Sequence, residues 1–224
     1  MKPSAKRQLP SVAASSPAPT VFVVDDDQSF RTAMGRYLRA AGYPVVLFAS
    51  GQEFFRQLPA NPAGCVLADL QMPGMSGLEL QAELVRNNQL LPVVFLTGRG
   101  DIPSSVRAMR QGAEDFLTKD APKEDLLAAV RRALARNARE RAARARQAEL
   151  RARFETLTDR EREVLSHVVR GRLNKQIAAD LGLNVRTVKL HRTAITTKFG
   201  VPSVAELTKL WVEAGFGVTP QPET

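Results

Sequence analysis

The chain has 224 residues, of which 44% are hydrophobic and 25% charged, and its formal net charge is +9. This is the composition of an ordinary soluble globular protein, with room for one large or two small domains. No apolar run approaches the roughly 18 residues that span a bilayer, and no signal-peptide core follows the N-terminus. These features argue against a membrane or secreted protein, so we expect a cytoplasmic location. The single cysteine, Cys65, lies in an apolar run and is expected to be a buried structural thiol.

The charge is unevenly distributed along the chain. Residues 1–19 carry a net +3 and residues 20–127 a net −3, whereas residues 128–224 hold 19 basic against 10 acidic residues, a net +9. Such separation predicts a nucleic-acid-binding half joined to a half with another role. A merely solvated basic surface would account for the arginines in the middle of the chain, but poorly for those at its far end.

The first half of the chain alternates between strand-like and helix-like segments. Residues 1–19 are rich in Pro, Ser and Ala without a period, which predicts a disordered tail. Short apolar runs then predict strands at Thr20–Val24, Val45–Phe48, Cys65–Ala68, Val93–Thr97 and Asp115–Thr118. Helices are expected between them at about 28–41, 51–58, 77–87, 103–111 and from 122 onward. This alternation predicts a doubly wound α/β fold, whose five-stranded parallel sheet is covered on both faces and carries its site at the carboxyl ends of the strands.

A long helix is expected to follow this domain. From Glu124 to about Glu155 there is no Gly or Pro, and Ala, Leu, Arg and Glu dominate. Leu127 and Val130 begin a heptad-like stripe, but Asn137 interrupts it, so we do not expect a sustained coiled coil. We interpret residues 128–154 as a helical linker whose arginines form a solvated face.

The C-terminal segment, residues 155–224, is predicted to be all helical. Thr158 and Glu161 form a capping box for a helix that runs to about Arg170. Further helices are expected at Lys175–Leu181, at Val185–Phe199 after the capping residue Asn184, and from Pro202, Ser203 and Glu206 onward. Two short helices joined by a tight Gly-containing turn, the second carrying basic residues, are typical of a helix-turn-helix.

Chemically distinctive residues follow the strands of the predicted sheet. Asp25 and Asp26 come directly after the first strand and Asp69 after the third, so their carboxylates should meet at one edge. Like charges at that distance repel, and all-oxygen ligands at a solvent-open site suit Mg²⁺. Thr97 and Lys119 end two further strands, and this combination can stabilise a phosphoryl group in transfer to an aspartate. Any one of these residues by itself would be ordinary in a loop at the end of a strand. Four suitable residue types at four strand ends are hard to obtain by chance.

The stretches VVDDDQSFR, LADLQMPGMSGLEL, VVFLTGRGDIP and AEDFLTKD resemble the receiver domain of two-component response regulators, over about residues 20–127. The resemblance implies that Asp69 is the phosphoacceptor, that Thr97 and Lys119 contact the phosphoryl oxygens, and that Mg²⁺ is held by Asp25, Asp26, Asp69 and the backbone carbonyl of Gln71. It also implies that Phe116 is the switch aromatic, with an ordinary core phenylalanine as the alternative. Asp27 falls outside the metal pair and is expected to cap a helix. Receivers of the similar FixJ type usually place proline after the lysine; Asp120 stands there in this chain, which leaves the geometry of that loop open.

The stretch LTDREREVLSHVVRGRLNKQIAADLGLNVRTVKLHRTAITTKFGV resembles the DNA-binding domain of the LuxR/NarL type. By position, the residues expected to face base edges in the major groove are Lys189, Leu190 and Thr193. Those expected to meet phosphates are Lys175, Arg186, Thr187 and Arg192. The residues spaced for the core are Ile177, Val188, Ile195 and Phe199.

Three hypotheses follow for the function. The first is a DNA-binding response regulator in which phosphorylation of Asp69 by a histidine kinase controls transcription. Its expected partners are double-stranded promoter DNA with a two-fold site, a second copy of the chain when phosphorylated and, as a candidate, RNA polymerase. The second is a DNA-binding regulator with a phosphorylation-independent receiver, which a missing Asp69 or Lys119 would have favoured. The third is an enzyme such as a phosphatase of the haloacid dehalogenase type, which needs a second acid close to the nucleophile. Leu70-Gln71-Met72 supplies none, so we expect no enzyme.

Overall fold

The computed structural model describes residues 18–98 and 102–217, the side chains of 102–104 excepted. The disordered tail predicted at 1–19 therefore lies outside the described residues, apart from its last two. The chain divides after Glu140 into an N-terminal unit and a C-terminal unit, and each is described by itself. None of the described helices is long and apolar enough to cross a membrane.

The N-terminal unit is built on a five-stranded parallel sheet with the order β2-β1-β3-β4-β5. Its strands are β1 (Thr20–Val24), β2 (Val45–Phe48), β3 (Gly64–Asp69), β4 (Val93–Thr97) and β5 (Asp115–Thr118). All five predicted strands are confirmed. Only β3 differs, by one residue at each end, because Gly64 still pairs with Thr20 and Asp69 with Leu96.

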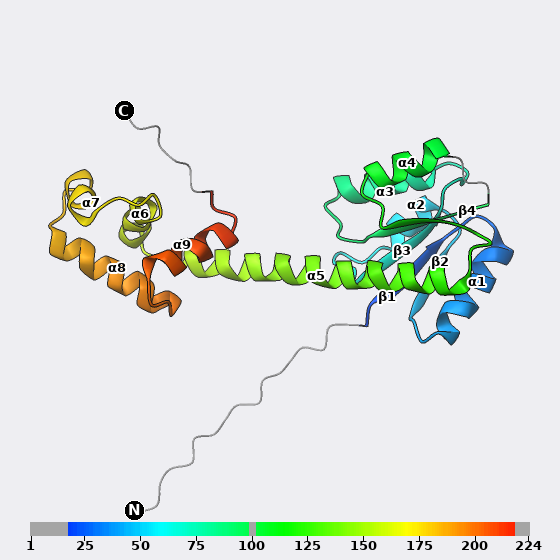
Figure 1. The fold of residues 1–224 in the computed structure, drawn as a ribbon, viewed down its shortest axis with the longest axis horizontal. Coiled ribbons are helices and arrows are strands. Elements are labelled where there is room, and N and C mark those ends of the chain that lie inside the picture. The colour runs from blue at the N-terminus through cyan, green and yellow to red at the C-terminus, as the bar shows by residue number, and fades with distance from the viewer. Residues whose placement is uncertain (1–17, 99–101, 218–224) are drawn as a thin grey trace, which may run out of the picture. The chain divides into compact units, whose positions relative to one another are not determined.

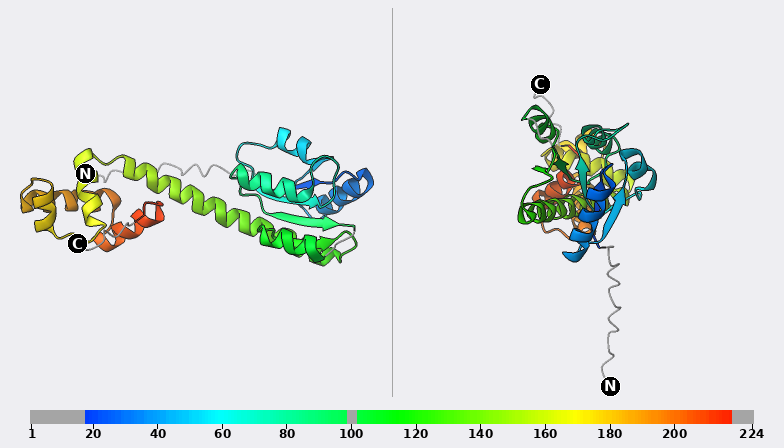
Figure 2. Two further views of the ribbon diagram at one scale, coloured as in Figure 1. Left: turned by 90° about the horizontal axis from the view of Figure 1, so that it is seen from above. Right: turned by 90° about the vertical axis from the view of Figure 1, so that its right-hand side faces the viewer.

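Helices cover both faces of this sheet, as Figures 1 and 2 show. They are α1 (Gln28–Ala40), α2 (Gly51–Gln57), α3 (Gly77–Arg86), α4 (Ile102–Arg110) and α5 (Lys123–Glu155). On one face Phe54 of α2 and Leu80 of α3 are buried with Phe95 of the sheet. On the other, Leu38 of α1 and Val130 of α5 are buried with alternate strand residues. The doubly wound fold predicted from the alternation of apolar runs is therefore confirmed.

Asn137 attaches α5 to the amino-terminal edge of the sheet. Its side chain is 2% exposed; its Oδ1 accepts the Gly64 N–H at 3.0 Å, and its Nδ2 donates to the Leu90 carbonyl at 2.5 Å. The sequence pattern predicts only that this residue interrupts a heptad-like stripe. The pattern did not reveal that the amide satisfies two backbone groups at the loops before β3 and β4.

We expect Asn137→Ala to destabilise the N-terminal unit by about 2–4 kcal/mol, because it removes the partner of a buried backbone donor and of a part-buried backbone acceptor. Denaturant unfolding followed by circular dichroism measures this change. Arg139→Ala, at an exposed position of the same helix, serves as the control and should change stability little. Equal stabilities for the two variants would show that water satisfies both groups.

The C-terminal unit is all helical, as predicted. Its own helices are α6 (Asp159–Val168), α7 (Asn174–Asp180), α8 (Val185–Phe199) and α9 (Val204–Glu213). Leu150 and Phe154, from the last turns of α5, are buried in the same core as Leu165, Ile177 and Ile195. The unbroken α5, seen from above in Figure 2, thus contributes residues to the cores of both units. The domain boundaries of 20–127, 128–154 and 155–224 stay predictions.

The bounds of two helices in this unit differ from expectation. α6 ends at Val168 rather than near Arg170, because the chain turns there into Gly171, which has a φ of +77°. α7 begins and ends one residue before the predicted Lys175–Leu181. The remaining capping signals are confirmed: Thr158 and Glu161 form a capping box, Asn184 caps α8, and Ser203 caps α9.

Candidate functional site

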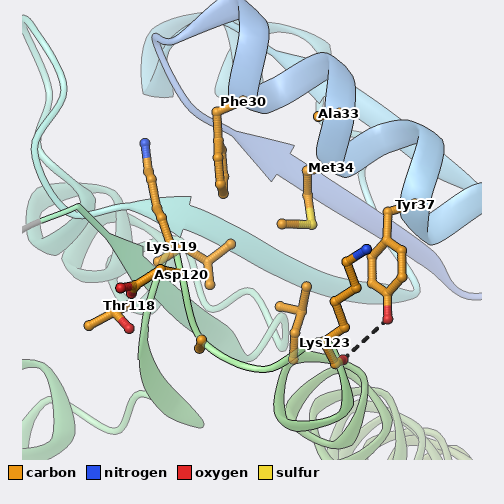
Figure 3. Close-up of a pocket in the computed structure, with 11 residues that line it drawn as sticks. Phe30, Ala33, Met34, Tyr37, Thr118, Lys119, Asp120 and Lys123 are labelled. Carbon is orange, nitrogen blue, oxygen red and sulfur yellow. Dashed lines mark hydrogen bonds between the residues drawn. The ribbon is translucent and has the colours of Figure 1, made fainter.

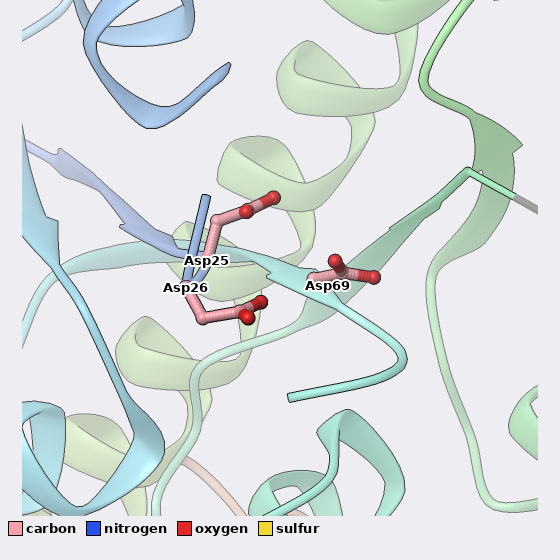
Figure 4. A group of neighbouring side chains, drawn as sticks. All are labelled: Asp25, Asp26 and Asp69. Carbon is pink, nitrogen blue, oxygen red and sulfur yellow. The ribbon is translucent and has the colours of Figure 1, made fainter. Parts of the chain in front are cut away.

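Three carboxylates meet at the carboxyl edge of the sheet. Asp25 and Asp26 follow β1, Asp69 ends β3, and each offers an oxygen within 4.8 Å of the others (Figure 4). Asp25 is 1% and Asp69 8% exposed, whereas Asp26 is exposed to solvent. Neighbouring parallel strands end side by side, which is why residues far apart in the sequence converge here. The predicted meeting of these carboxylates is confirmed.

Lys119 supplies the cation that this cluster requires. Its Nζ lies 2.7 Å from Asp25 Oδ2 and 2.8 Å from Asp69 Oδ2. Burial raises the pKa of Asp25, and the hydrogen bonds from Lys119 and the Asp27 N–H offset only part of that rise. Burial would lower the pKa of Lys119, but its bonds to the two carboxylates outweigh burial and raise it. The lysine therefore stays charged between the two aspartates.

The other residues predicted for this site lie on β4, on β5 and in the loop after β3. Thr97 ends β4, is buried, and its carbonyl accepts the Lys119 N–H at 2.8 Å. The Gln71 N–H donates to Asp69 Oδ1 at 3.2 Å, which fixes the loop after β3 beside the carboxylate. Phe116 of β5 is half-buried, with its ring centroid 6.3 Å from that of Phe95. These positions do not test the roles assigned to Thr97, the Gln71 carbonyl and Phe116, which stay predictions.

Two local expectations near the site are resolved. Asp27 caps α1, because its Oδ1 accepts the N–H groups of Ser29 at 2.8 Å and Phe30 at 3.2 Å. No peptide bond is cis among the described residues, so the loop that follows Lys119 is trans at Asp120. Sequence reasoning missed Phe30, whose ring lies beside the Lys119 ammonium. The signal available was its place in the first turn of the helix that Asp27 caps.

The predicted DNA-binding face lies on α7 and α8. On α8 the side chains of Lys189, Leu190 and Thr193 are exposed, and Leu190 is 64% exposed although it is apolar. The opposite side of the helix is buried: the core residues predicted there and on α7, Ile177, Val188, Ile195 and Phe199, are confirmed. An amphipathic helix with a basic, exposed face is thus available to a major groove.

The residues predicted to meet phosphates differ in their exposure and in their hydrogen bonds within the protein. Lys175 and Arg186 are exposed. The Thr187 hydroxyl donates to Asn184 Oδ1 at 2.9 Å, as part of the cap of α8. Arg192 is half-buried and donates to Asn174 Oδ1 of α7. The structure brings all four to the helix-turn-helix, and their contacts with DNA stay predictions.

The end of α8 is held by residues that sequence reasoning did not single out. Lys198 of α8 lies 2.6 Å from the buried Glu161 Oε2, the capping-box residue of α6. Arg153 of α5 donates to the Phe199 carbonyl at 3.1 Å, and Phe154 packs on the Phe199 ring with centroids 4.3 Å apart. The C-terminus of α8 is therefore fixed by α5 and α6.

We expect the C-terminal unit to lose stability in acid through Glu161. Burial would raise the pKa of Glu161, but hydrogen bonds from Lys198 and Thr158 outweigh it and lower the pKa. A lowered pKa contributes stability that is present above the unfolded value of about 4.3 and is lost as pH falls through the folded value. Fluorescence of the single tryptophan, Trp211 of this unit, follows unfolding. Glu161→Gln should unfold more easily than wild type at neutral pH, and a gap that stays constant below pH 4 would contradict the assignment.

Comparison with known proteins identifies the family. Residues 21–131 match the model of the response regulator receiver domain, and residues 155–211 match that of the bacterial regulatory proteins of the luxR family. Nodulation protein W of Bradyrhizobium diazoefficiens is 42% identical over 190 residues, covering 85% of this chain and 84% of that protein. This chain belongs to the DNA-binding response regulators.

Solved structures agree with this assignment. The response regulator StyR is similar with a TM-score of 0.75 and 44% identity, covering 88% of this chain and 99% of that one. Full-length FixJ from B. japonicum matches with a TM-score of 0.54 and 34% identity, covering 89% and 98%. The response regulator described here is thus a two-component, DNA-binding regulator with a receiver and a LuxR-type helix-turn-helix, and the resemblances drawn from its motifs are confirmed.

Proposed function

We propose that Asp69 accepts a phosphoryl group from a cognate histidine kinase and that this modification controls promoter binding by α7 and α8. The observation that carries the proposal is the Lys119 ammonium between Asp25 and Asp69, with Asp26 alongside. This site places the partly shielded carboxylate nucleophile of Asp69 beside the fixed cation of Lys119, at the carboxyl edge of the sheet.

The transfer follows from these positions. A carboxylate oxygen of Asp69 attacks phosphorus, and the P–N bond of a phosphohistidine breaks. The imidazole nitrogen leaves with the bonding electrons and takes a proton from solvent. Lys119 counters negative charge on the phosphoryl oxygens, and the Gln71 N–H holds Asp69 in orientation. The hydroxyl of Thr97 is the proposed further contact to these oxygens. The protein would modify itself once rather than turn over a substrate, and in that sense it is not an enzyme.

The site suits Mg²⁺. Three carboxylates within 4.8 Å against one ammonium leave the cluster negative, and the exposed Asp26 keeps one side open to water. Asp25, Asp26, Asp69 and the backbone carbonyl of Gln71 would hold the ion. When bound, it supplies positive charge to the phosphoryl oxygens. Chelation should therefore stop phosphorylation, and phosphorylation unaffected by chelator would reject this role.

We further propose that the phosphorylated protein dimerises through α4 and β5. Val106 and Met109 of α4 are apolar side chains that are 43% and 48% exposed, and α4 packs against β5, which carries Phe116. A dianion at Asp69 would draw Thr97 toward it and shift this face. A dimer would pair two recognition helices on a two-fold promoter site. Release of the recognition helix is the alternative route.

RNA polymerase is a candidate partner at the promoter. With DNA and a histidine kinase as partners, the protein would act in the cytoplasm.

The test is phosphorylation followed by DNA selection. The full-length protein is incubated with phosphoramidate and Mg²⁺, and acid-labile phosphate is measured per chain. Phosphorylated and untreated samples then select fragments from genomic DNA. We expect about one phosphate per chain and stronger enrichment by the phosphorylated sample. Equal enrichment would favour the phosphorylation-independent regulator, and repeated turnover of an added phosphoester would favour an enzyme.

A further inference from the structure

Three groups in the described part of the chain lie beside the Lys119 ammonium at the edge of the sheet. Two are the carboxylates of Asp25 and Asp69, at 2.7 and 2.8 Å. The third is the ring of Phe30, whose centroid lies 4.4 Å from Nζ. Figure 3 shows Lys119 rising from the end of β5 beside this ring, which projects from α1. A cation within about 6 Å of a ring centroid is attracted to the negative face of the ring.

The backbone of α1 fixes Phe30 in this place. The Phe30 N–H donates to the Asp27 side chain, which sets the first turn of the helix. Asp27, the third aspartate of the run at residues 25–27, therefore serves as the N-cap of α1. It determines where the helix starts, and so which side chain faces Lys119.

Phe30 also borders open space. A cavity of about 370 Å³ lies between α1 and the loop after β5, lined by both Phe30 and Lys119, with the small side chains of Ala33 and Ala121 among its walls (Figure 3). A long lysine side chain has room to move into this cavity. The ring of Phe30 counteracts that movement by attracting the ammonium where it stands.

We propose that Phe30 is a positioning residue that holds the Lys119 ammonium against the Asp69 carboxylate before a phosphoryl group arrives. An aromatic face is suited to this task, because it attracts the ammonium without adding a formal negative charge. A carboxylate in the same place would compete with Asp69 for the lysine and repel the phosphoryl oxygens. The consequence for phosphorylation rests on the proposed function, whereas the contact itself does not.

The first test is spectroscopic and needs no phosphoryl transfer. The ε-methylene protons of Lys119 lie close to the ring and should show a ring-current shift in NMR spectra of protein labelled with ¹³C-lysine. Phe30→Leu should abolish the shift and Phe30→Tyr should keep it. Phe55→Leu is the matched control, because Phe55 is also half-buried in the N-terminal unit but packs on Phe54, at 5.1 Å between centroids. An unchanged Lys119 signal in Phe30→Leu overturns the proposal.

The second test is the rate of phosphorylation by phosphoramidate with Mg²⁺. Loss of one cation–π contact should slow Phe30→Leu about 2- to 5-fold, while Phe30→Tyr restores most of the rate and Phe55→Leu matches wild type. Thermal unfolding of the four proteins shows whether lost packing accounts for any difference. The positioning role is overturned if Phe30→Tyr is phosphorylated as slowly as Phe30→Leu, or if Phe30→Leu is phosphorylated as fast as the wild-type protein. A wild-type protein that takes up no phosphate refutes the proposed function and leaves the ring-current prediction to be judged by itself.

Discussion

Asp69→Asn is expected to take up no phosphoryl group from phosphoramidate in the presence of Mg²⁺. An amide oxygen carries no formal charge and is a poor nucleophile toward phosphorus. The substitution also replaces the oxygen that pairs with Lys119 at 2.8 Å, although the lysine keeps its contact with Asp25. The loss should therefore be complete at the acceptor while the fold is retained. Acid-labile phosphate per chain, measured alongside circular dichroism, checks both statements.

The matched control for this experiment is Asp120→Asn. Asp120 is an exposed carboxylate in the loop after β5, at the same end of the sheet, and has no place in the proposed machinery. It should therefore be phosphorylated about as fast as the wild-type protein. Acid-labile phosphate that persists on Asp69→Asn would move the acceptor to another residue and invalidate the proposed mechanism.

Lys189→Ala is expected to relax the base preference of the protein. Lys189 is exposed on α8, on the side away from Val188, Ile195 and Phe199. Loss of a base contact should cost about 1–3 kcal/mol, roughly 10- to 100-fold in affinity, at cognate sites and little at unrelated ones. Arg186→Ala removes an exposed basic residue one turn earlier and should weaken all sequences alike, lowering the salt slope by about one.

These two variants form a better pair than one that includes Arg192. Arg192 is bound to Asn174 of α7, so its removal changes the helix-turn-helix itself as well as any phosphate contact. Binding is measured across a panel of selected and unrelated fragments at several salt concentrations. If Lys189→Ala and Arg186→Ala affect the whole panel in the same way, the recognition face has been assigned incorrectly.

The sequence alone determined much of this response regulator. Buried parallel strands are near-continuous apolar runs, so all five were predicted, and the carboxyl ends of such strands lie at one edge. That rule alone placed Asp25, Asp69 and Lys119 together, although the last two are 50 residues apart. Helix ends were predicted for a similarly local reason. A capping side chain binds a backbone group of its own helix, as Thr158 and Asn184 do.

Other contacts were decided only by the tertiary structure. Asn137 binds Gly64 across 73 residues, and Lys198 binds Glu161 across 37. Phe30 faces Lys119 from α1, which joins β1 to β2, whereas Lys119 follows β5. Periodicity tells which face of a helix is buried, but not which loop, helix end or charge lies opposite it. Partners of this kind depend on how far each helix extends along its neighbours, and that is fixed by packing in three dimensions.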